Sequence, residues 1–414
     1  MSGRIFQRLT AACDRAGWMA VHRGVPPAWL GGRWVPIETV PQYFARHRNA
    51  RDAGRFEIVH PTGVAENPLP LNVTSVDDLP PERGWWGFSF RDVPRRPSGE
   101  TFVATLPKCR VVWYREPARA NDFYPAVMTA DGRGLDMREL RFRPRHAQVL
   151  RRTPEPVRLA RATWIVERVY HNHSHWLTAH LPKLLLLRDR GALGDVLLPR
   201  ERTAAIDGSL RAVGLDPAEF ETFDPSRPLL VGELTIVGTD RFRPELLRLA
   251  ARAFQAAGST APWRRVFISR SRATRRRLVN EEEVWTIFER EGFEPVHMEA
   301  LSFDEQLALM RETAILAAPH GAGLTNMLMC PPGAHVLEIA DLTFPNPNFY
   351  ALAAALGHHY WLVGGEGSGG GHPLDRDLRV DPARVRDAVR QVVAVGNRPH
   401  WTARAQAGAG ERSW

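Results

Sequence analysis

Residues 318–327, with the sequence APHGAGLTNM, combine residue types that could bind a small anion. An apolar run at 314–317 predicts a strand before them, and residues 324–329 are expected to form a short helix. Gly321 and Gly323 lack the Cβ atoms that would keep a ligand away from the backbone. The unpaired N–H groups and the positive dipole end of the helix favour a negative group. The segment therefore predicts a phosphate cradle for a phosphate-bearing donor substrate, with a ligand-free strand-to-helix turn as the alternative.

A second candidate site is the basic stretch at 267–277, FISRSRATRRR, at the end of a predicted strand. The carboxyl end of a strand in an α/β sheet faces the ligand crevice, so these arginines would point toward a bound group. Asn280 is a plausible N-cap for the next helix, and the acids at 281–283 complement its dipole. A few of these arginines could clamp a diphosphate without a metal ion. A solvated basic loop is the alternative.

The composition of the 414-residue chain is that of a globular protein with a basic surface. Hydrophobic residues make up 44% of the sequence, and the formal net charge is +9. Lysine occurs only at Lys108 and Lys183, so nearly all positive charge is arginine, which suits planar phosphate and carboxylate groups. A GC-rich genome would also enrich arginine. No basic module with interleaved stacking aromatics is evident, so we expect no nucleic-acid partner.

The cysteines and the apolar stretches indicate the compartment. Cys13, Cys109 and Cys330 are sparse and far apart, which argues against a disulfide framework and a cysteine metal site. Residues 1–20 lack the continuous apolar core of a secretory signal, and no apolar run is long enough to span a bilayer. We therefore expect a cytoplasmic protein, with peripheral attachment to the acidic inner face of the membrane left open.

The pattern of apolar runs and turns predicts four regions. Residues 1–150 are rich in proline and short strands and form a β-rich N-terminal accessory region. Residues 151–255 and 256–395 each alternate strands and helices, which predicts two Rossmann-like domains. A polar break at 255–262 lies between them, and residues 396–414 form a flexible tail. The fold class is therefore α/β, with ligands expected in the cleft between the two domains, where parallel strands end.

Individual elements follow from the same patterns. Strands are expected at 101–106, 110–114, 123–128, 161–169, 196–198, 228–237, 265–269, 294–297, 313–318 and 335–339. Helices are expected at 176–190, 202–213, 244–254, 280–291, 303–312 and 382–393. Residues 94–100 and 364–371 are expected to be loops, the second because it is rich in glycine.

The order of several motifs resembles glycosyltransferase family 61. Ser269-Arg270, Arg276 and Asn280-Glu281 resemble its SR-x-x-x-x-x-R-x-x-x-NE pattern. Residues 301–306 resemble its L-S-F-x-x-Q segment, 319–326 its PHGAGLTN motif, 336–339 its V-L-E-I strand, and 175–184 its H-W-L-x-x-x-L-P-R-L segment. These motifs keep the family's order over roughly residues 160–345.

The resemblance implies a GT-B architecture, in which two Rossmann-like domains face each other across a cleft. It implies an inverting transfer from a nucleotide sugar, commonly a UDP-sugar, without a metal ion or another cofactor. The expected acceptor is a glycan or a lipid-linked saccharide, in the setting of polysaccharide assembly.

The same resemblance implies roles for individual residues. Arg270 and Arg276 would contact the donor diphosphate, and His320, Gly321, Ala322 and Gly323 would direct backbone N–H groups at it. Glu338 would accept hydrogen bonds from ribose, while Asn326 and Gln306 would shape the donor pocket. A departing diphosphate requires positive charge where its negative charge develops, which agrees with these residue types.

One position departs from the family pattern. Bacterial relatives often carry an acid where this chain has Ala179, and an inverting transfer needs a general base for the acceptor hydroxyl. We hypothesise that His175 is this base because it belongs to a matching motif; a packed structural histidine is the alternative. His173, His180 and Glu167 are further candidates.

Weaker features also have structural alternatives. His171, His173 and His175 alternate like ligands on one face of a strand, but a closed zinc site needs more ligands, so a polar loop is favoured. Asp375-Arg376-Asp377 resembles a metal-holding D-x-D pair and is interpreted as a surface turn. Burial in the core is the alternative for the candidate sugar-stacking residues Trp85, Trp86 and Trp113.

Rival functions are less well supported. An esterase would need a G-x-S-x-G elbow, which the chain lacks. A nicotinamide oxidoreductase would carry G-x-G-x-x-G at its first βα turn, whereas here that spacing occurs late, at 365–370. The main alternative is a non-catalytic GT-B shell that binds a nucleotide or glycan without turnover, because of Ala179.

Overall fold

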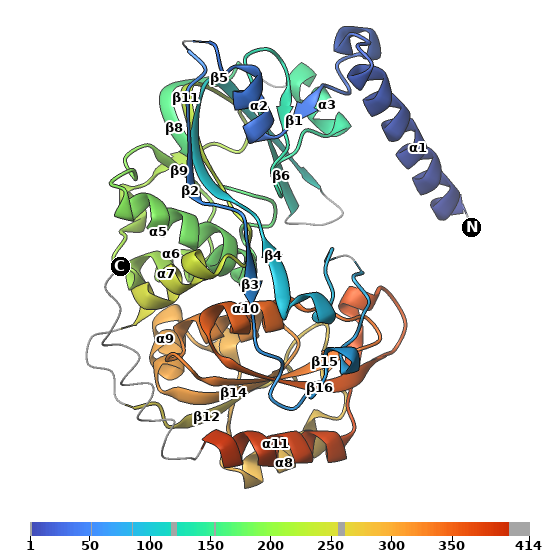
Figure 1. Ribbon diagram of the computed structural model, residues 1–414, viewed down its shortest axis with the longest axis vertical. Helices are drawn as coiled ribbons and strands as arrows, with labels where there is room; N and C mark the ends of the chain where they lie inside the picture. The colour runs from blue at the N-terminus through green and yellow to red at the C-terminus, as the bar shows by residue number, and fades with distance from the viewer. Residues whose placement is uncertain are drawn as a thin grey trace.

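The structure, a computed structural model, describes residues 2–50, 52–84, 86–116, 122–152, 155–255 and 261–396. Trp85 and nearly all of the expected tail, residues 397–414, lie outside these ranges. Figure 1 shows two lobes, an upper lobe around one large sheet and a lower lobe around a second sheet. The protein is therefore a mixed α/β protein.

The upper lobe holds a nine-stranded sheet. Its order is β1 (Ile37–Glu38), β7 (Gly134–Leu135), β6 (Asp122–Met128), β5 (Thr101–Glu116), β11 (Leu229–Gly238), β8 (Val157–Trp164), β9 (Val196–Pro199) and β10 (Glu221–Phe223), with β2 (Arg55–His60) paired to β5. The pairs from β11 through β8 and β9 to β10 are parallel, and those from β11 through β5 and β6 to β7 are antiparallel. The sheet is therefore half parallel and half antiparallel.

Strand β5 joins the regions that the sequence analysis separated at residue 150. It pairs with β11 from Phe102 opposite Gly238 to Val111 opposite Leu229. The strands expected at 101–106 and 110–114 are thus one strand of 16 residues. Because hydrogen bonds of one sheet connect both regions, the accessory region and the block that follows it share a core.

The lower lobe holds a six-stranded sheet. Its order is β13 (Glu294–Val296), β12 (Arg264–Ile268), β14 (Thr313–Pro319), β15 (His335–Asp341), β16 (His359–Ser368) and β17 (Asp377–Arg379). All pairs are parallel except β16 with β17. Helices α8 (Glu281–Arg290) and α11 (Pro382–Gly396) cover the face away from the upper lobe, and α9 (Phe303–Arg311), α10 (Asn348–Leu356) and the 3-10 helix η7 (Ala322–Met329) lie on the other face (Figure 1).

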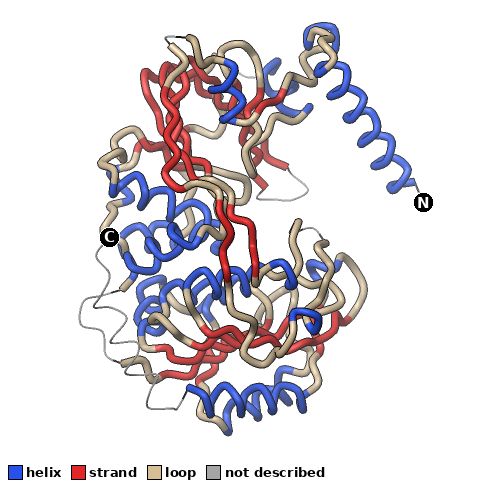
Figure 2. Tube along the Cα trace, viewed as in Figure 1, coloured by secondary structure: helices blue, strands red, loops and turns tan. Residues whose placement is uncertain are grey.

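The remaining elements surround the two sheets. They are α1 (Ser2–His22), α2 (Val40–Arg46), α3 (Pro144–Arg152), α4 (His173–His175), a π-helical turn η4 (Trp176–His180), α5 (Leu181–Asp189), α6 (Ala204–Ala212), α7 (Pro244–Phe254), β3 (Gly63–Glu66) and β4 (Arg95–Ser98). Short 3-10 turns are η1 (Pro27–Leu30), η2 (Val76–Asp78), η3 (Phe90–Asp92), η5 (Pro217–Glu219), η6 (Met298–Ala300) and η8 (Pro373–Asp375). Figure 2 shows α1 extending away from both sheets. None of the helices in the described part of the chain combines the length and the hydrophobicity needed to span a bilayer.

Several expected boundaries need correction. Residues 95–98, expected in a loop, form β4 and pair with β3. The loop expected at 364–371 is a strand as far as Ser368, because its glycines admit a neighbour: a Cβ on Gly365 would lie 2.6 Å from the carbonyl oxygen of Arg379. The helix expected at 176–190 is divided by a π-helical turn before Pro182, which has no N–H to donate.

Helices and an N-terminal segment hold the lobes together. Helix α7 of the upper lobe packs on α10, and α6 packs on α9. The sequence analysis missed α10, whose side chains are apolar on nearly all sides because it lies between the lobes. In the N-terminal segment, the Leu71 N–H donates to Tyr360 O at 2.8 Å, and Asn72 Nδ2 donates to Leu362 O at 2.7 Å. This segment thus runs along β16 of the lower sheet.

Candidate functional site

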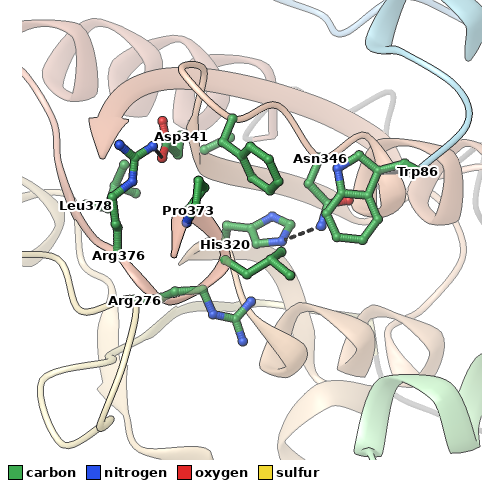
Figure 3. A pocket seen from close by; sticks show the side chains of 11 residues that line it. Trp86, Arg276, His320, Asp341, Asn346, Pro373, Arg376 and Leu378 are labelled. Carbon is green, nitrogen blue, oxygen red and sulfur yellow. Dashed lines mark hydrogen bonds and ion pairs between the residues drawn. The ribbon is translucent and has the colours of Figure 1, made fainter. Parts of the chain in front are cut away.

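A pocket opens at the carboxyl ends of β14 and β15, beside the N-terminal segment (Figure 3). Its walls combine cations, a histidine and aromatic rings: Trp86, Arg276, His320, Ala340, Asp341, Phe344, Asn346, Pro373, Leu374, Arg376 and Leu378. The two strands are parallel neighbours, so the residues that follow them converge at one edge of the sheet. The structure thus brings two predicted donor-site residues, Arg276 and His320, to one pocket.

His320 is fixed in the pocket wall by a hydrogen-bonded chain. Asn346 Nδ2 donates to its Nε2 at 3.0 Å, so the proton lies on Nδ1, which donates to the Glu338 carboxylate. The other Glu338 oxygen accepts from the Tyr360 hydroxyl, and burial together with this carboxylate raises the pKa of Tyr360 well above its ordinary value. Glu338 is fully buried. Glu338 does not line the pocket, so the ribose contact expected of it would require the side chains that cover it to move.

The glycine loop is shaped by Arg270. Its Nε and Nη2 donate to the carbonyl oxygens of Arg276 and Arg275, both at 2.9 Å. Its guanidinium lies against Gly321, where an added Cβ would be 2.2 Å from Nη1. Gly323 is less crowded, since its Cβ would lie 3.2 Å from the Ile268 side chain. Arg270 therefore holds the basic loop to the glycine loop, and Gly321 leaves the space for it.

Arg276 lies on a loop that two ion pairs of its neighbours hold in place. It has a left-handed φ of 56°, and burial lowers the pKa of its guanidinium. Among the described residues, no hydrogen bond or ion pair holds that guanidinium, and Figure 3 shows Arg276 and His320 in the wall of the same pocket. The arginines beside it are paired, since Arg275 contacts Asp375 at 2.9 Å and Arg277 contacts Asp377 at 2.9 Å.

This pairing corrects the interpretation of residues 375–377. They were expected to be a surface turn, but both acids hold the basic loop, and Arg376 lines the pocket and reaches Asp341 Oδ2 at 3.4 Å. Within the part of the chain that the structure describes, Arg376 Nε is buried and has no hydrogen-bond partner. The pocket thus holds two guanidinium groups, of Arg276 and Arg376, whose donors are not all used.

Asn326 and Gln306 lie behind the glycine loop. Asn326 is fully buried; its Nδ2 donates to Gln306 Oε1 at 2.9 Å, and its Oδ1 contacts His173 Nε2 at 2.6 Å. Gln306 Nε2 donates to the carbonyl oxygens of Met298 and Leu301. These residues support η7 and connect it to α4 in the upper lobe, rather than lining the pocket.

The two candidate tryptophans that the structure describes lie in different environments. Trp86 forms one wall of the pocket, near Phe344, and its Nε1 donates to Pro345 O at 2.9 Å. Trp113 is buried in the upper core and stacks on Trp164 with ring centroids 5.6 Å apart. Trp86 is therefore the tryptophan placed to stack on a ligand.

The sequence of the region that builds this site matches a known family. The family model of glycosyltransferase 61 matches residues 173–337. That segment is a glycosyltransferase 61 domain. The match confirms the family resemblance predicted from the motifs.

Two relatives of similar sequence are also named as glycosyltransferases. The chain is 31% identical over 169 residues to the beta-1,2-xylosyltransferase XAX1 of Oryza sativa subsp. japonica, covering 39% of this chain and 30% of that protein. It is 39% identical over 80 residues to the EGF domain-specific O-linked N-acetylglucosamine transferase of Drosophila melanogaster, covering 18% of this chain and 15% of that protein. The chain thus spans less than one third of the length of either relative.

His175 lies close to the start of the matched segment, among positively charged side chains. Its Nδ1 contacts Asn172 Oδ1 at 3.2 Å, and its Nε2 faces Arg241 Nη1 at 3.5 Å. Burial and the positive charges of Arg241 and Arg138 strongly lower the pKa of His175. The imidazole is therefore neutral at neutral pH, and its Nε2 lone pair accepts a long hydrogen bond from Arg241 Nη1, since a guanidinium can only donate.

The other candidates for the base are already engaged. The Glu167 N–H donates to His180 Nε2 at 3.0 Å, and His180 Nδ1 contacts His175 O at 3.0 Å, which marks His180 as structural. Glu167 is buried and pairs with Lys183 and Arg138. Burial raises the pKa of Glu167, but these two cations outweigh it and bring the pKa to about 2. His173 is held by Asn326.

Some residues of the site were not found from the sequence. Phe344, Asn346, Asp341 and Arg376 join the pocket only when β15, β16 and β17 assemble, although the run Asn346-Pro347-Asn348 after a strand is a turn signal at a strand's carboxyl end. Within the described residues, no three His, Cys, Asp or Glu side chains gather as a metal site.

Proposed function

We propose that this protein is an inverting, metal-independent glycosyltransferase that moves a sugar from a nucleotide sugar, a UDP-sugar in the first instance, to a glycan or lipid-linked saccharide. The observation that carries the proposal is the pocket at the ends of β14 and β15, in and beside the glycosyltransferase 61 domain. It combines the guanidinium of Arg276, which has no partner among the described residues, with aromatic walls and with His320, the residue that leads into the glycine loop. These are the groups that a nucleoside diphosphate needs.

The donor would lie with its diphosphate between the two loops. Arg276 and the backbone N–H groups of 321–323 would bind the phosphates, and Arg376 has a buried N–H without a partner on the same side. Trp86 and Phe344 offer ring faces for the nucleobase. Positive charge fixed at the departing diphosphate lowers the barrier, because negative charge develops there as the glycosidic bond breaks.

His175 is the proposed general base. Its Nε2 accepts a long hydrogen bond from Arg241 Nη1, which an acceptor hydroxyl would have to replace in order to pass its proton to Nε2. His175 is part of α4, which contacts η7 behind the glycine loop. The positive charge of Arg241 opposes that protonation. An anion close to Arg241 would reduce the opposition. His175→Gln should abolish transfer and leave UDP binding unchanged, and a variant with full activity would exclude this role.

A GT-B arrangement of the two lobes fits the same chemistry. The lower lobe has a six-stranded, mainly parallel sheet that would bind the donor. The upper lobe contributes the parallel strands β8 and β11, whose carboxyl ends carry His175 and Arg241 on the loops that follow. Donor and acceptor would thus meet between the two lobes.

The proposal is tested by thermal denaturation with UDP in the presence of EDTA. A ligand that binds only the folded state raises the midpoint, so UDP should raise it for the wild-type protein. Arg276→Ala should lose the shift. Arg272→Ala is the matched control, because Arg272 is an exposed arginine of the same loop that does not line the pocket. No shift with any nucleotide or nucleotide sugar would overturn the proposal.

The non-catalytic alternative has one specific observation in its favour. The position of the family's acid is Ala179, and the candidates His180 and Glu167 are engaged in structural contacts. A shell that only binds would give the UDP shift without releasing UDP from any UDP-sugar. Measuring UDP release across a panel of UDP-sugars, with and without acceptor glycans, separates the two.

A further inference from the structure

A second cationic site lies at the carboxyl ends of β8 and β11 in the upper lobe, apart from the donor pocket. Arg138, Arg168 and Arg241 come from three different loops, and Glu167 and Lys183 lie buried below them. Arg138 pairs with Glu167, and Arg168 pairs with Asp122 at 3.4 Å and Glu139 at 3.0 Å. Bases therefore outnumber acids by one in this group, and the surplus base is Arg241.

Arg241 is held in place by neutral groups only. Its Nε donates to Thr178 Oγ1 and its Nη2 donates to Ser174 Oγ, both at 2.8 Å. Among the described residues, no carboxylate lies within ion-pair distance of its guanidinium. A half-buried guanidinium without a counter-charge is unfavourable, and burial with the charge of Arg138 lowers the pKa of Arg241 to about 9. Two hydroxyls fix its orientation, and of the acids in the described part of the chain Glu167 and Glu139 act on its charge only from beyond ion-pair distance.

The site faces the proposed reaction centre. Arg241 Nη1 lies 3.5 Å from His175 Nε2, and Ser174, which anchors Arg241, is next to His173. His173 contacts Asn326 on η7, directly behind the glycine loop of the donor pocket. A group bound to Arg241 would therefore lie beside the proposed base and on the acceptor side of the donor.

We propose that Arg241, oriented by Ser174 and Thr178, binds a carboxylate or phosphate group of an acidic acceptor beside His175. This inference rests on the proposed glycosyltransferase function and specifies its acceptor class. Arginine donors in a fixed fork match the planar carboxylate and the phosphate alike. Such an anion would also offset the positive charge next to His175, so that the acceptor itself raises the proton affinity of the base that deprotonates it.

The test uses the full-length protein with saturating UDP on a glycan array. The array carries neutral oligosaccharides, the same oligosaccharides with a uronic acid in place of a hexose, and the same oligosaccharides with a phosphate. We expect the wild-type protein to retain the acidic members over their neutral partners. A preference for the uronic acids or for the phosphates identifies the source of the anion.

Variants of Arg241 test whether the preference for acidic glycans comes from this residue. Arg241→Gln should weaken binding of the acidic members about 30-fold, as expected when one partner of a desolvated charge pair is removed. Arg241→Lys should restore part of it. UDP affinity and the melting midpoint should stay close to wild type. Arg290→Gln is the control for net charge, because Arg290 is exposed on α8 at the far face of the lower sheet.

The outcomes are distinguishable from failure of the proposed function. Equal retention of neutral and acidic glycans, or no retention by a protein that binds UDP, would overturn the acidic acceptor. Loss of UDP affinity in Arg241→Gln would assign Arg241 to the donor and also overturn it. Failure of the wild-type protein to bind UDP overturns the proposed function instead.

Discussion

Each lobe places at its candidate site an arginine that has no acid within ion-pair distance among the described residues, Arg276 below and Arg241 above, but the two are held in opposite ways. In the lower lobe, Arg276 stands on a loop between Arg275 and Arg277, which pair with Asp375 and Asp377. In the upper lobe, Arg241 is anchored by the hydroxyls of Ser174 and Thr178, above a buried ion pair. In the lower site, ion pairs of the neighbouring residues fix the loop that carries the arginine. In the upper site, hydroxyl groups and the buried Glu167–Lys183 pair fix the arginine itself. We therefore expect substitutions that disturb the loop of the lower site to lower ligand affinity. Substitutions in the buried ion pair under the upper site should lower the free energy of unfolding.

The buried charge pair gives the largest expected effect. Glu167→Gln leaves Lys183, with a side chain only 1% exposed, without its counter-charge. Breaking such a pair costs about 3–5 kcal/mol of the free energy of unfolding. Urea unfolding measures it, and Glu66→Gln is the control because Glu66 and Arg95 form an exposed pair. If both variants lose the same free energy of unfolding, the buried pair does not stabilise the upper lobe more than an exposed pair does.

The same carboxylate predicts a pH dependence. The pKa of Glu167 is about 2 in the folded protein, below its ordinary value of 4.5. Its contribution to stability is therefore complete above about pH 4.5 and is lost as the pH falls toward 2. The midpoint of thermal unfolding should fall more steeply in this range for the wild-type protein than for Glu167→Gln. Parallel profiles would contradict the pairing.

In the lower lobe, Gly321→Ala should disable donor binding without unfolding the protein. The new Cβ would lie 2.2 Å from Arg270 Nη1, so Arg270 would have to leave the loop that it holds. Overpacking of this kind costs about 1–3 kcal/mol. Because the cost falls on the loop conformation that binds the donor, UDP affinity should fall by about 5-fold to 150-fold. Calorimetric titration measures it. Gly370→Ala is the control, since nothing lies within 4 Å of its added Cβ, and it should bind like the wild type.

A smaller loss is expected when the aromatic wall is removed. Trp86→Ala takes away one face of the donor pocket, and stacking of a base on an aromatic ring contributes about 1–3 kcal/mol. UDP affinity should fall roughly tenfold, and Trp86→Phe should recover part of it. Trp263, which is 60% exposed and outside the pocket, provides the control variant Trp263→Ala. If both alanine variants bind UDP equally, the nucleobase lies elsewhere.

The smallest effect concerns the seam between the accessory region and the parallel strands. Thr105 and Thr235 share a hydrogen bond of 3.0 Å between β5 and β11. Thr235→Val should lower the free energy of unfolding by about 1 kcal/mol, while Thr222→Val, at an exposed position of β10, should leave it unchanged. A stability loss confined to one of two separate unfolding transitions would show that the regions fold independently.

The sequence predicted the lower lobe better than the upper lobe. Helix α9 begins as expected at Phe303 and ends one residue early, and the strands at 313–318 and 335–339 differ from β14 and β15 only by short extensions. Each of these elements has a clear apolar period and packs on a neighbour that is close in sequence. The pairing of Phe102 with Gly238 was not predictable, because no local pattern specifies a partner so far along the chain.

The site was predictable in its residue types but not in its contacts. The motif placed His320 and Arg276 near a ligand, and the structure brings both to the pocket. Glu338 and Asn326 have the polarity of ligand contacts, yet each is fully buried and bonded to other side chains. Arg241 was not singled out, since a lone arginine after a strand becomes conspicuous only when its missing counter-charge can be seen.

The stretch that carries the family pattern is smaller than the unit that can fold. Residues 173–337 contain β11, β14 and only the first residues of β15, and they lack β5, to which β11 is bonded, and β16, to which β15 is bonded. They also lack the segment around Leu71 and Asn72 that runs along β16. A protein trimmed to the matched stretch would expose two raw sheet edges and aggregate rather than bind. Domain grafting or truncation should therefore keep residues from about 55 through 396, the span from β2 to the end of α11.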